Sequence, residues 1–414
     1  MNRAASSRPS GPAANSRFAE KETGDSVRRR DEYFLRKRGL IFGVPPAAYA
    51  KAMEHMRAMR RRRFNSASPG AEESAAIWNF IGPQPIIQFS PLNPTGTGRL
   101  TAVAVDPNVN NRVIVGAANG GVWLSNDDGN TFTPIFDSQP TLAIGSIALD
   151  PGTNPTTIYV GTGEGNTSAD SYYGQGIFRS TDLGMTWEQL GKTSFANYAI
   201  GALAIDTSVT PRILFAAVTE GLSDTRGEAD YDESTIKAGL FKSTDAGATW
   251  SRFDASAFGL EAGYYYAMDD VAIDPSSDRR IYVAGAGGAF ASTDGGNTWS
   301  SINFPGLSSG SAGRVKIAVS QSGTVYLMVG EAQDLSDGAV SFLGFYKSTD
   351  FGNSWATETV PCENGIDGTP TGAGSACGAS YYAQSWYDQA LLVDPRDPSD
   401  NTVVFGGVEL YISH

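Results

Sequence analysis

The sequence predicts an all-β fold, a β-propeller of four-stranded blades, and three observations predict it. A short motif recurs five times along the chain. Short runs of alternating apolar residues precede and follow the copies of this motif. Glycine and proline are abundant, with 48 and 21 copies, whereas charged residues make up only 18%, a composition typical of many tight turns. Four short strands in each repeat of about 50 residues are typical of a propeller blade.

Each repeat supplies its four predicted strands in the same order. A first strand alternates, as at residues 100–106 and 202–206, and a turn leads to a second strand such as 112–116 or 281–284. A third strand runs into the motif, as at residues 176–180, and a fourth strand follows it. The turns between first and second strands and the motif turns should then share one face of the propeller. The longer connections should share the opposite face, which we call the long-loop face.

The repeated motif reads Ser-x-Asp-x-Gly-x-Thr-Trp, with Phe in place of Trp once and Ser in place of Thr once. Its aspartates are Asp127, Asp182, Asp245, Asp294 and Asp350, which are separated by 55, 63, 49 and 56 residues. An aspartate opens a tight turn by accepting backbone N–H bonds, and glycine supplies a conformation that a Cβ would forbid. The aromatic ring should pack between blades, which stabilises by roughly 2–3 kcal/mol. We therefore expect these five aspartates to be structural.

The sixth unit of the repeat is incomplete in the sequence. It contains three strand-like runs, over residues 386–395, 402–407 and 408–411, and no copy of the motif follows them. The sequence thus predicts a propeller of these repeats over residues 76–414 that is truncated at its C-terminal end, unless residues 78–87 supply the missing strand and close the ring.

The N-terminal region differs from the repeats in composition. Residues 1–45 are expected to form a disordered basic arm, because they are rich in Ser, Ala, Arg and Gly and contain few large apolar residues. Residues 46–75 are expected to form a short amphipathic helix and a linker. Tyr49, Met53 and Met56 in this segment fall on one face of a helix.

Charge and composition exclude several classes of function. Residues 1–75 carry a net charge of +8 and residues 76–414 one of −21, so the propeller would repel nucleic acid and anionic membranes. The run Arg60–Arg63 is expected to be solvated, with a nucleic-acid or lipid-headgroup anchor as the alternative. With only two histidines and two cysteines, we expect neither a metal nor a cofactor. The sequence contains no run of 18 apolar residues, so we expect no transmembrane helix. No secretion signal is visible in it either.

The long-loop face should carry the ligand-binding residues. Aromatic rings with nearby carboxylates suit stacking on sugars, or contact with a basic patch on a protein partner. The aromatic candidates are Tyr172, Tyr173, Tyr264, Tyr265, Tyr266, Tyr381, Tyr382 and Trp386. Arg99 and Arg314 open first strands near the propeller axis and are further candidates. The alternative is that the tyrosines pack their own loops and the carboxylates are solvated.

Catalysis would need carboxylates at the axial ends of first strands. The catalytic candidates are Asp269, Asp270 and Asp388, since a glycosidase places two carboxyl groups about 5–9.5 Å apart across the scissile bond. A sialidase would also need an arginine cluster to hold a carboxylate. Only Arg99 and Arg314 occupy suitable positions, so sialidase activity is disfavoured.

Cys362 and Cys377 bracket a glycine-rich insertion, and we expect them to form a disulfide. Closing this loop would stabilise the fold by about 3 kcal/mol in the chain-entropy model. The bridge would also fit an oxidising compartment.

The repeated motif is similar to the Asp box, also called the bacterial neuraminidase repeat (BNR), and the likeness covers roughly residues 78–411. The chain resembles the Asp-box propellers, which include sialidases, xyloglucanases, sortilin-type receptor domains and photosystem-assembly factors. The likeness is strongest to bacterial sortilin-like or glycosyl-hydrolase-like BNR proteins. Residues 78–85 (WNFIGPQP) and 161–166 (GTGEGN) resemble signatures of that group, whereas no segment matches the catalytic segments of xyloglucanases.

This resemblance implies an extracellular or periplasmic protein. The leading expectation is a binding or scaffold propeller that recognises a glycan or a protein partner on its long-loop face. One alternative is a glycoside hydrolase acting on a polysaccharide. The other is a receptor-like domain that binds peptides as sortilin does.

Overall fold

The computed structural model describes most of the predicted propeller and isolated positions of the N-terminal region. The described residues are 98–166, 171–219, 238–261, 266–275, 279–285, 288–305, 312–331, 342–358, 389–406 and 410–413, together with Tyr33, Lys51, Glu54, His55, Ala58, 86–87 and 95–96. Apart from Tyr33, which is helical, the predicted arm lies outside the described residues. The four described positions between 51 and 58 are helical, within the range expected for the amphipathic helix. The predicted Cys362–Cys377 bridge lies outside the described residues.

The first three blades are four-stranded antiparallel sheets. The first contains β3 (Leu100–Val105), β4 (Val113–Ala117), β5 (Gly121–Ser125) and β6 (Thr133–Pro134). The second contains β7 (Ile144–Asp150), β8 (Thr157–Thr162), β9 (Ile177–Ser180) and β10 (Glu188–Leu190), followed by the short helix α3 (Lys192–Phe195). The third contains β11 (Ala199–Asp206), β12 (Ile213–Thr219), β13 (Gly239–Ser243) and β14 (Ser251–Arg252), followed by the 3-10 helix η3 (Ala255–Phe258).

Two further four-stranded blades and one three-stranded blade complete the described series. The fourth contains β15 (Met268–Ile273), β16 (Ile281–Gly285), β17 (Gly288–Ser292) and β18 (Ser300–Ile302). The fifth contains β19 (Ala312–Val319), β20 (Val325–Glu331), β21 (Phe342–Ser348) and β22 (Ala356–Glu358). The sixth contains β23 (Ala390–Val393), β24 (Val403–Gly406) and β25 (Leu410–Ile412). The all-β propeller predicted from the sequence is therefore confirmed.

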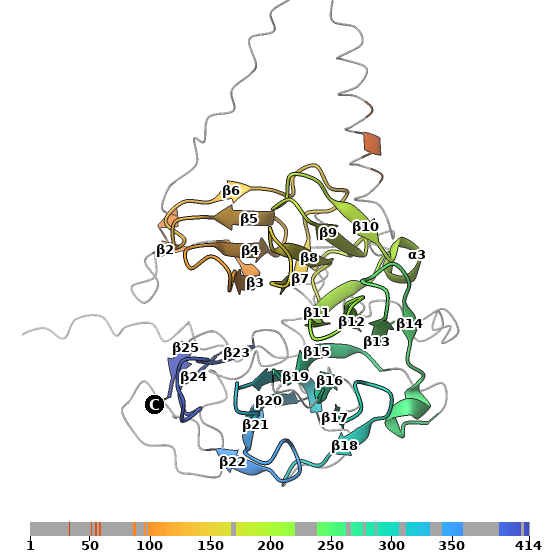
Figure 1. Cartoon of the computed structure of the whole chain (residues 1–414), viewed down its shortest axis with the longest axis vertical. Helices are drawn as coiled ribbons and strands as arrows, with labels where there is room; N and C mark the ends of the chain where they lie inside the picture. The colour runs from red at the N-terminus through yellow and green to blue at the C-terminus, as the bar shows by residue number, and fades with distance from the viewer. Residues whose placement is uncertain are drawn as a thin grey trace, which may run out of the picture.

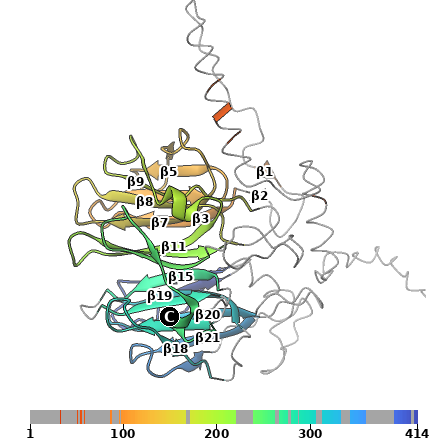
Figure 2. The same cartoon turned by 90° about the vertical axis from the view of Figure 1, so that its right-hand side faces the viewer.

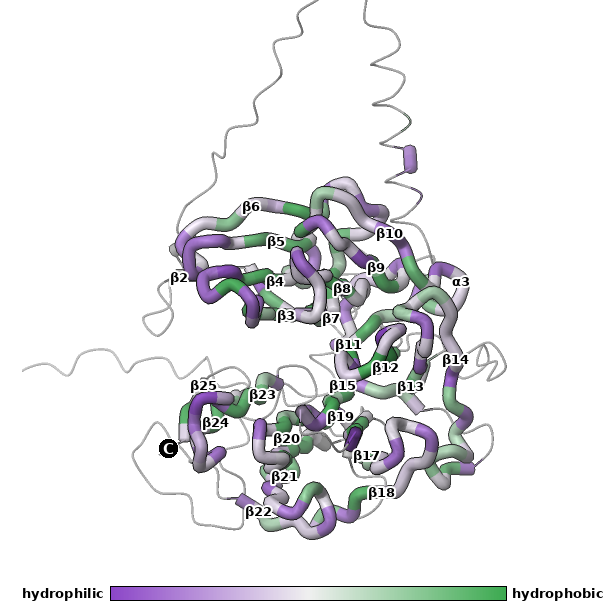
Figure 3. Tube along the Cα trace, in the orientation of Figure 1, coloured by the Kyte–Doolittle hydropathy of each residue, from purple (hydrophilic) through white to green (hydrophobic). Residues whose placement is uncertain are grey.

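The blades follow one another around a common centre, and the first strand of each blade is the innermost (Figure 1). In the series β3, β7, β11, β15, β19 and β23, each innermost strand contacts the one that follows it in the series. Seen edge-on, the sheets stack with their strands running across the view (Figure 2). The second strands are among the most hydrophobic segments, and the turns are hydrophilic (Figure 3). We call the line around which the innermost strands gather the propeller axis.

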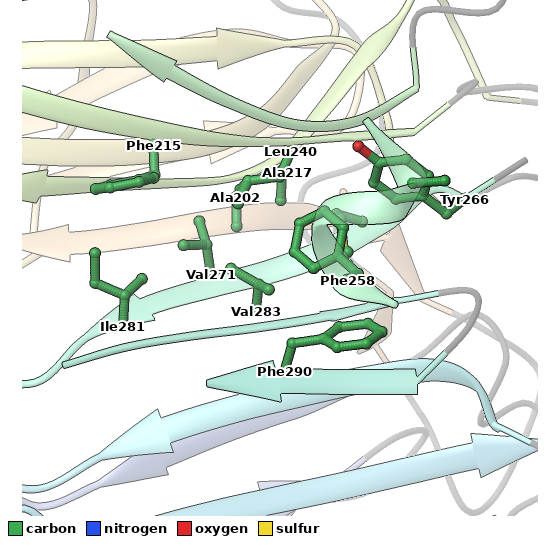
Figure 4. Close-up of a cluster of buried hydrophobic side chains, with 12 residues drawn as sticks. Ala202, Phe215, Ala217, Leu240, Phe258, Tyr266, Val271, Ile281, Val283 and Phe290 are labelled. Atoms are coloured by element: carbon green, nitrogen blue, oxygen red, sulfur yellow. The ribbon is translucent and has the colours of Figure 1, made fainter. Parts of the chain in front are cut away.

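A separate hydrophobic core fills each of the five interfaces between consecutive blades. Because side chains alternate along a strand, one strand serves two cores. In β12, Leu214 packs in the core that contains Tyr159 of the second blade, whereas Phe215 packs in the core that contains Val271 and Val283 of the fourth blade. Figure 4 shows the core between the third and fourth blades, which contains Phe215, Val271 and Val283.

In all five Asp boxes the aspartate accepts hydrogen bonds from the Ser that opens the motif and from the Thr or Ser four residues after the aspartate, as the third blade illustrates. Asp245 Oδ1 accepts hydrogen bonds from the hydroxyl of Ser243 and the N–H of Thr249, each at 2.8 Å, and its Oδ2 accepts the Thr249 hydroxyl at 2.6 Å. Hydrogen bonds from Thr249 and Ser243 lower the pKa of Asp245 to about 2. The Trp250 indole N–H donates to the carbonyl of Gly247 at 2.9 Å and closes the turn. These bonds stabilise the turn between the third and fourth strands.

The turns between first and second strands lie on the same face as the Asp boxes. In the first blade, the N–H of Asp128 donates to the carbonyl of Asn111 at 3.0 Å, which joins the two kinds of turn. Between blades, Arg212 of the third blade donates to Asp150 of the second at 2.8 Å. The long-loop face is therefore the opposite one, where the first strands begin.

The segment expected to close the ring is described only in part. Its residues Ile86–Ile87 form β1, which pairs with β2 (Thr95–Gly96) in a two-stranded sheet of its own. Within the described residues, no strand pairs with the sixth blade to complete it. Val103 of β3 and Leu392 of β23 lie outside the cores that join the first and sixth blades to their described neighbours, and they are 63% and 59% exposed.

Candidate functional site

The innermost strands of the first five blades share a bulge near their starts on the long-loop face. The register shifts fall at Leu100/Ala102, Ile144/Ser146, Ile200/Ala202, Met268/Asp270 and Ala312/Val315. The residues inside these shifts are Thr101, Gly145, Gly201, Asp269, and Gly313 with Arg314. A bulge residue is unpaired in the strand ladder, and such positions often re-aim a side chain near a functional site. Asp269 and Arg314 are the charged residues among them.

Glycine at two of these bulges allows the innermost strands to approach closely. A Cβ at Gly201 would lie 3.0 Å from the carbonyl oxygen of Asp269, and a Cβ at Gly145 would collide with the carbonyl of Ile200. Thr101 instead donates its hydroxyl to the carbonyl of Ile144 at 2.7 Å. The first three blades thus use their bulges to join neighbouring strands, and the fourth and fifth blades place charged side chains there.

Arg314 connects opposite parts of the propeller. Its Nη2 donates to Asn166 Oδ1 at 2.8 Å and its Nη1 to the carbonyl of Gly165 at 3.3 Å, both on the connection that follows β8 in the second blade. Gln389, just before β23, donates its side-chain amide to the Arg314 carbonyl at 3.4 Å. Arg314 Nε and Gln389 Oε1 are buried and have no hydrogen-bond partner among the described residues. The group formed by Asn166, Arg314 and Gln389 thus has one donor, Arg314 Nε, and one acceptor, Gln389 Oε1, without a partner among the described residues.

Asp269 has the most unusual ionisation in this region. Burial raises its pKa to about 6, and this effect exceeds the opposing charges of Arg314 and Lys316, while the neighbouring Asp270 raises the pKa further. The residue nevertheless keeps part of its surface accessible. A carboxyl group that is surrounded by protein but still reached by water can exchange protons near neutral pH.

Asp270 has a different role from the residue before it. Its Oδ2 accepts the N–H of Ile317 at 3.0 Å and lies 3.4 Å from Lys316 Nζ, both in the fifth blade, and its Oδ1 accepts its neighbour's N–H at 3.0 Å. Asp270 therefore links the innermost strands of the fourth and fifth blades. The third catalytic candidate, Asp388, lies outside the described residues.

Arg99, the other arginine expected near the axis, forms an ion pair with Glu164 of the second blade. The Glu164 side chain is only 1% exposed, so this pair holds a buried charge between the first two blades. Glu164 and Asn166 belong to the segment GTGEGN, which the sequence singled out for its resemblance and not as a site. Asn166 and Gln389 were missed because their position at the axis follows from the folding of connections, which no local pattern encodes.

The aromatic candidates are only partly brought to this region. Tyr266 is a correction, because its ring is completely buried in the core of Figure 4 and its hydroxyl donates to the carbonyl of Phe253. A ring in that position cannot stack on a ligand, so its role is structural. Tyr172 and Tyr173 are half-buried near Glu164, whose N–H donates to the Tyr172 carbonyl at 3.0 Å. The remaining candidates, Tyr264, Tyr265, Tyr381, Tyr382 and Trp386, lie outside the described residues.

The part of the chain that the structure describes contains no group of three or more His, Cys, Asp or Glu side chains that could hold a metal ion. None of its helices is both long and apolar enough to cross a bilayer. What the arrangement at the axis offers is therefore hydrogen bonding, charge and one carboxyl group that titrates near neutral pH.

No family model matches the sequence, and no curated protein matches it. Solved structures do match. An ancestral GH74 enzyme is 22% identical with a TM-score of 0.54, over 78% of this chain and 37% of that one. The GH74 enzyme of Niastella koreensis is 20% identical with a TM-score of 0.51, over 76% and 44%. The GH74 xyloglucanase of Xanthomonas campestris is 19% identical with a TM-score of 0.46, over 77% and 45%.

This chain therefore spans less than half of the length of each of these three structures. At such identities the likeness concerns the fold, a β-propeller of the kind found in GH74 enzymes. It agrees with the fold predicted from the Asp boxes and with the suspected relation to glycosyl-hydrolase-like propellers.

Proposed function

We propose that this Asp-box β-propeller is an extracytoplasmic glycan-binding protein whose ligand sits at the propeller axis on the long-loop face. One observation carries the proposal, namely the convergence of Asn166, Arg314 and Gln389 from three different blades beside Asp269. A sugar presents hydroxyl groups that both donate and accept hydrogen bonds. The group at the axis offers guanidinium and amide donors together with amide and carboxyl acceptors.

The bulges give this group the rigidity that ligand binding requires. Asp269 and Arg314 are fixed by the backbone of innermost strands, and Arg314 is held further by Asn166 and Gly165. Side chains that are positioned before the ligand arrives lose little entropy on binding. The placement outside the cytoplasm rests on the resemblance to BNR proteins, many of which are secreted.

Glycoside hydrolysis is a second candidate, because Asp269 has a pKa raised to about 6 by burial. A general acid is most effective when its pKa lies near the working pH, and glycosidases use such a carboxyl group to protonate the leaving oxygen. The adjacent Asp270 is unsuited to be its partner, since the Ile317 N–H and Lys316 already engage it. Asp388 is the remaining sequence candidate for the second carboxylate.

A glycan array combined with a panel of polysaccharide hydrolysis assays tests both candidates. A binding protein retains one class of glycan and releases no product, and Arg314→Gln weakens that retention about tenfold, the effect of losing about 1.4 kcal/mol. A hydrolase releases product, and Asp269→Asn stops turnover while the glycan is still retained.

Arg396→Gln is the matched control, because Arg396 is exposed and forms an ion pair with its neighbour Asp394 on the opposite face. Folded protein that retains no glycan, but retains members of a basic peptide library, would replace this proposal with the peptide-receptor alternative. Fractionation of the cells that produce the protein tests its location separately, and the protein should be found outside the cytoplasmic fraction.

A further inference from the structure

A groove with a volume of about 310 Å³ opens between the outer strands of the third blade and the Asp box of the fourth. Its lining residues are Lys242, Thr244, Thr249, Ser251, Arg252, Phe253, Gly296 and Asn297. The lining thus combines two cations, three hydroxyl groups, one amide and one aromatic ring, and contains no carboxylate. This volume lies at the lower end of the range for small-molecule sites. The groove lies on the Asp-box side and does not involve the group at the axis.

The repeat makes it possible to compare Lys242 with equivalent positions in other blades. In the strand pairing, Lys242 of β13 faces Ser251 of β14, whereas Arg179 of β9 faces Glu188 of β10. Arg179 and Glu188 form an ion pair with an N–O distance of 2.5 Å. Serine replaces the carboxylate in the third blade, so the cation there lacks the cross-strand partner that neutralises its equivalent in the second.

The ammonium group of Lys242 is held by neutral groups. It donates to the carbonyl of Gly295 at 2.9 Å and to Asn297 Oδ1 at 3.2 Å, and it lies 5.5 Å from the centre of the Phe215 ring. No carboxylate among the described residues lies within ion-pair distance of it. Burial and the charge of Arg279 lower the pKa of Lys242, against the longer-range charges of Asp294 and Asp206.

Arg252 adds a second cation that other blades lack. Its Nε donates to the carbonyl of Ala238 at 2.8 Å, and its guanidinium lies 5.0 Å from the centre of the Tyr266 ring. The residues that occupy the same register position in the other four-stranded blades are Pro134, Gln189, Ser301 and Thr357. Among the five four-stranded blades, only the third therefore combines a cation on its third strand with a cation on its fourth.

Nearby carboxylates are directed into their own turns. Both oxygens of Asp245 accept hydrogen bonds from Ser243 and Thr249, and both oxygens of Asp294 accept bonds within residues 292–298. Lys242 and Arg252 thus both belong to a lining without carboxylates, on a propeller whose sequence is strongly acidic.

We propose that this groove binds the oxyanionic group of an acidic sugar, a carboxylate or a sulfate ester. Lys242 and Arg252 provide the charge, and guanidinium suits the geometry of an oxyanion. The exposed Ser251 hydroxyl provides a further donor. The Phe253 ring provides an apolar surface for the face of a pyranose. The proposal does not depend on what binds at the axis.

Nuclear magnetic resonance titration with galacturonic acid, galactose 6-sulfate and neutral galactose tests this site. Both acidic sugars should shift the signals of the groove, and galactose should not. Comparing the affinities of galacturonic acid, a carboxylate, and galactose 6-sulfate, a sulfate ester, identifies which oxyanion is preferred. Bound anion should also raise the pKa of Lys242, measured from its side-chain carbon shifts, since a nearby negative charge favours the ammonium form.

Ser251→Glu installs in the third blade the carboxylate that the second blade carries, and it should weaken binding of both acidic sugars at least about tenfold. Arg252→Glu provides a second variant with the same expected result. Ser300→Glu, at the equivalent position of β18 facing Ala291, is the matched control and should leave binding unchanged. The proposal is overturned if galactose binds as well as the acidic sugars, or if acidic sugars bind equally to the wild type and the Ser251→Glu variant.

Discussion

Arg314 of the fifth blade and Asn166 of the second blade, 148 residues apart, are joined by a 2.8 Å hydrogen bond across the propeller axis. Most other contacts between blades join immediate neighbours, whereas this one spans two intervening sheets. It therefore couples the connection after β8 to the start of β19 and fixes the geometry of the candidate site.

Replacing Arg314 with methionine should lower the free energy of unfolding by about 1–3 kcal/mol. The reason is that Asn166 and the carbonyl of Gly165 lose their donors, and each hydrogen bond contributes about 0.5–1.5 kcal/mol. Urea unfolding at neutral pH measures the change. Arg396→Met should leave stability unchanged, because its side chain is 86% exposed. Equal losses in the two variants would contradict the role given to the bond across the axis.

Replacing Asp269 with asparagine should stabilise the protein at neutral pH. Since the pKa of Asp269 is about 6 in the folded state and the ordinary pKa of an aspartate is 3.8, the folded protein holds a proton that the unfolded chain has lost between these pH values. Stability of the wild type therefore falls as pH rises from about 4 to 6, by at most about 3 kcal/mol. The advantage of the variant should grow over that interval and then level off, which unfolding curves at pH 4, 5, 6 and 7.5 can follow. A constant difference between the proteins would refute the shifted pKa.

Replacing Asp245 with alanine should lower the melting temperature by a few degrees and leave glycan affinity at the propeller axis intact. The carboxylate organises the Asp box, and its pKa is lowered to about 2 by hydrogen bonds from Thr249 and Ser243. The contribution of this carboxylate is complete above the ordinary aspartate pKa of 3.8 and is lost as pH falls towards 2, so the deficit of the variant should shrink in acid. Thermal scans from pH 7 to 2 measure this trend, which is opposite in sign to that of Asp269.

Replacing Tyr266 with phenylalanine should cost about 1–2 kcal/mol of stability without changing glycan binding, because only a buried hydrogen bond to Phe253 is lost. Tyr266→Ala should cost about 3–5 kcal/mol, since it leaves a cavity in the core between the third and fourth blades. Denaturant unfolding and a glycan-binding assay separate the two roles. Weaker binding by a stable Tyr266→Phe protein would restore the tyrosine to the list of ligand-binding residues.

The sequence predicted the fold well because the Asp box fixes both a turn and its place in the blade. Asp269 and Arg314 were also expected at the axial ends of innermost strands, where the structure has them. The bulges were not predicted, because in β15 the register shift follows directly after the first residue, Met268, before any alternation is established in the sequence. Tyr266 was misplaced because three consecutive tyrosines suggested a surface cluster, whereas its burial depends on contacts with Phe253 and Phe258 that no local pattern encodes.

The bulges also determine which substitutions the innermost strands can accept. A residue that is unpaired in the ladder can be exchanged without shifting the alternation of the strand that carries it. Thr101 and Asp269 occupy corresponding sites in sheets of the same design, yet one ties two backbones together and the other contributes an acid. The side chain at the centre of the propeller can therefore differ from blade to blade while the surrounding sheets keep the same strand pairing.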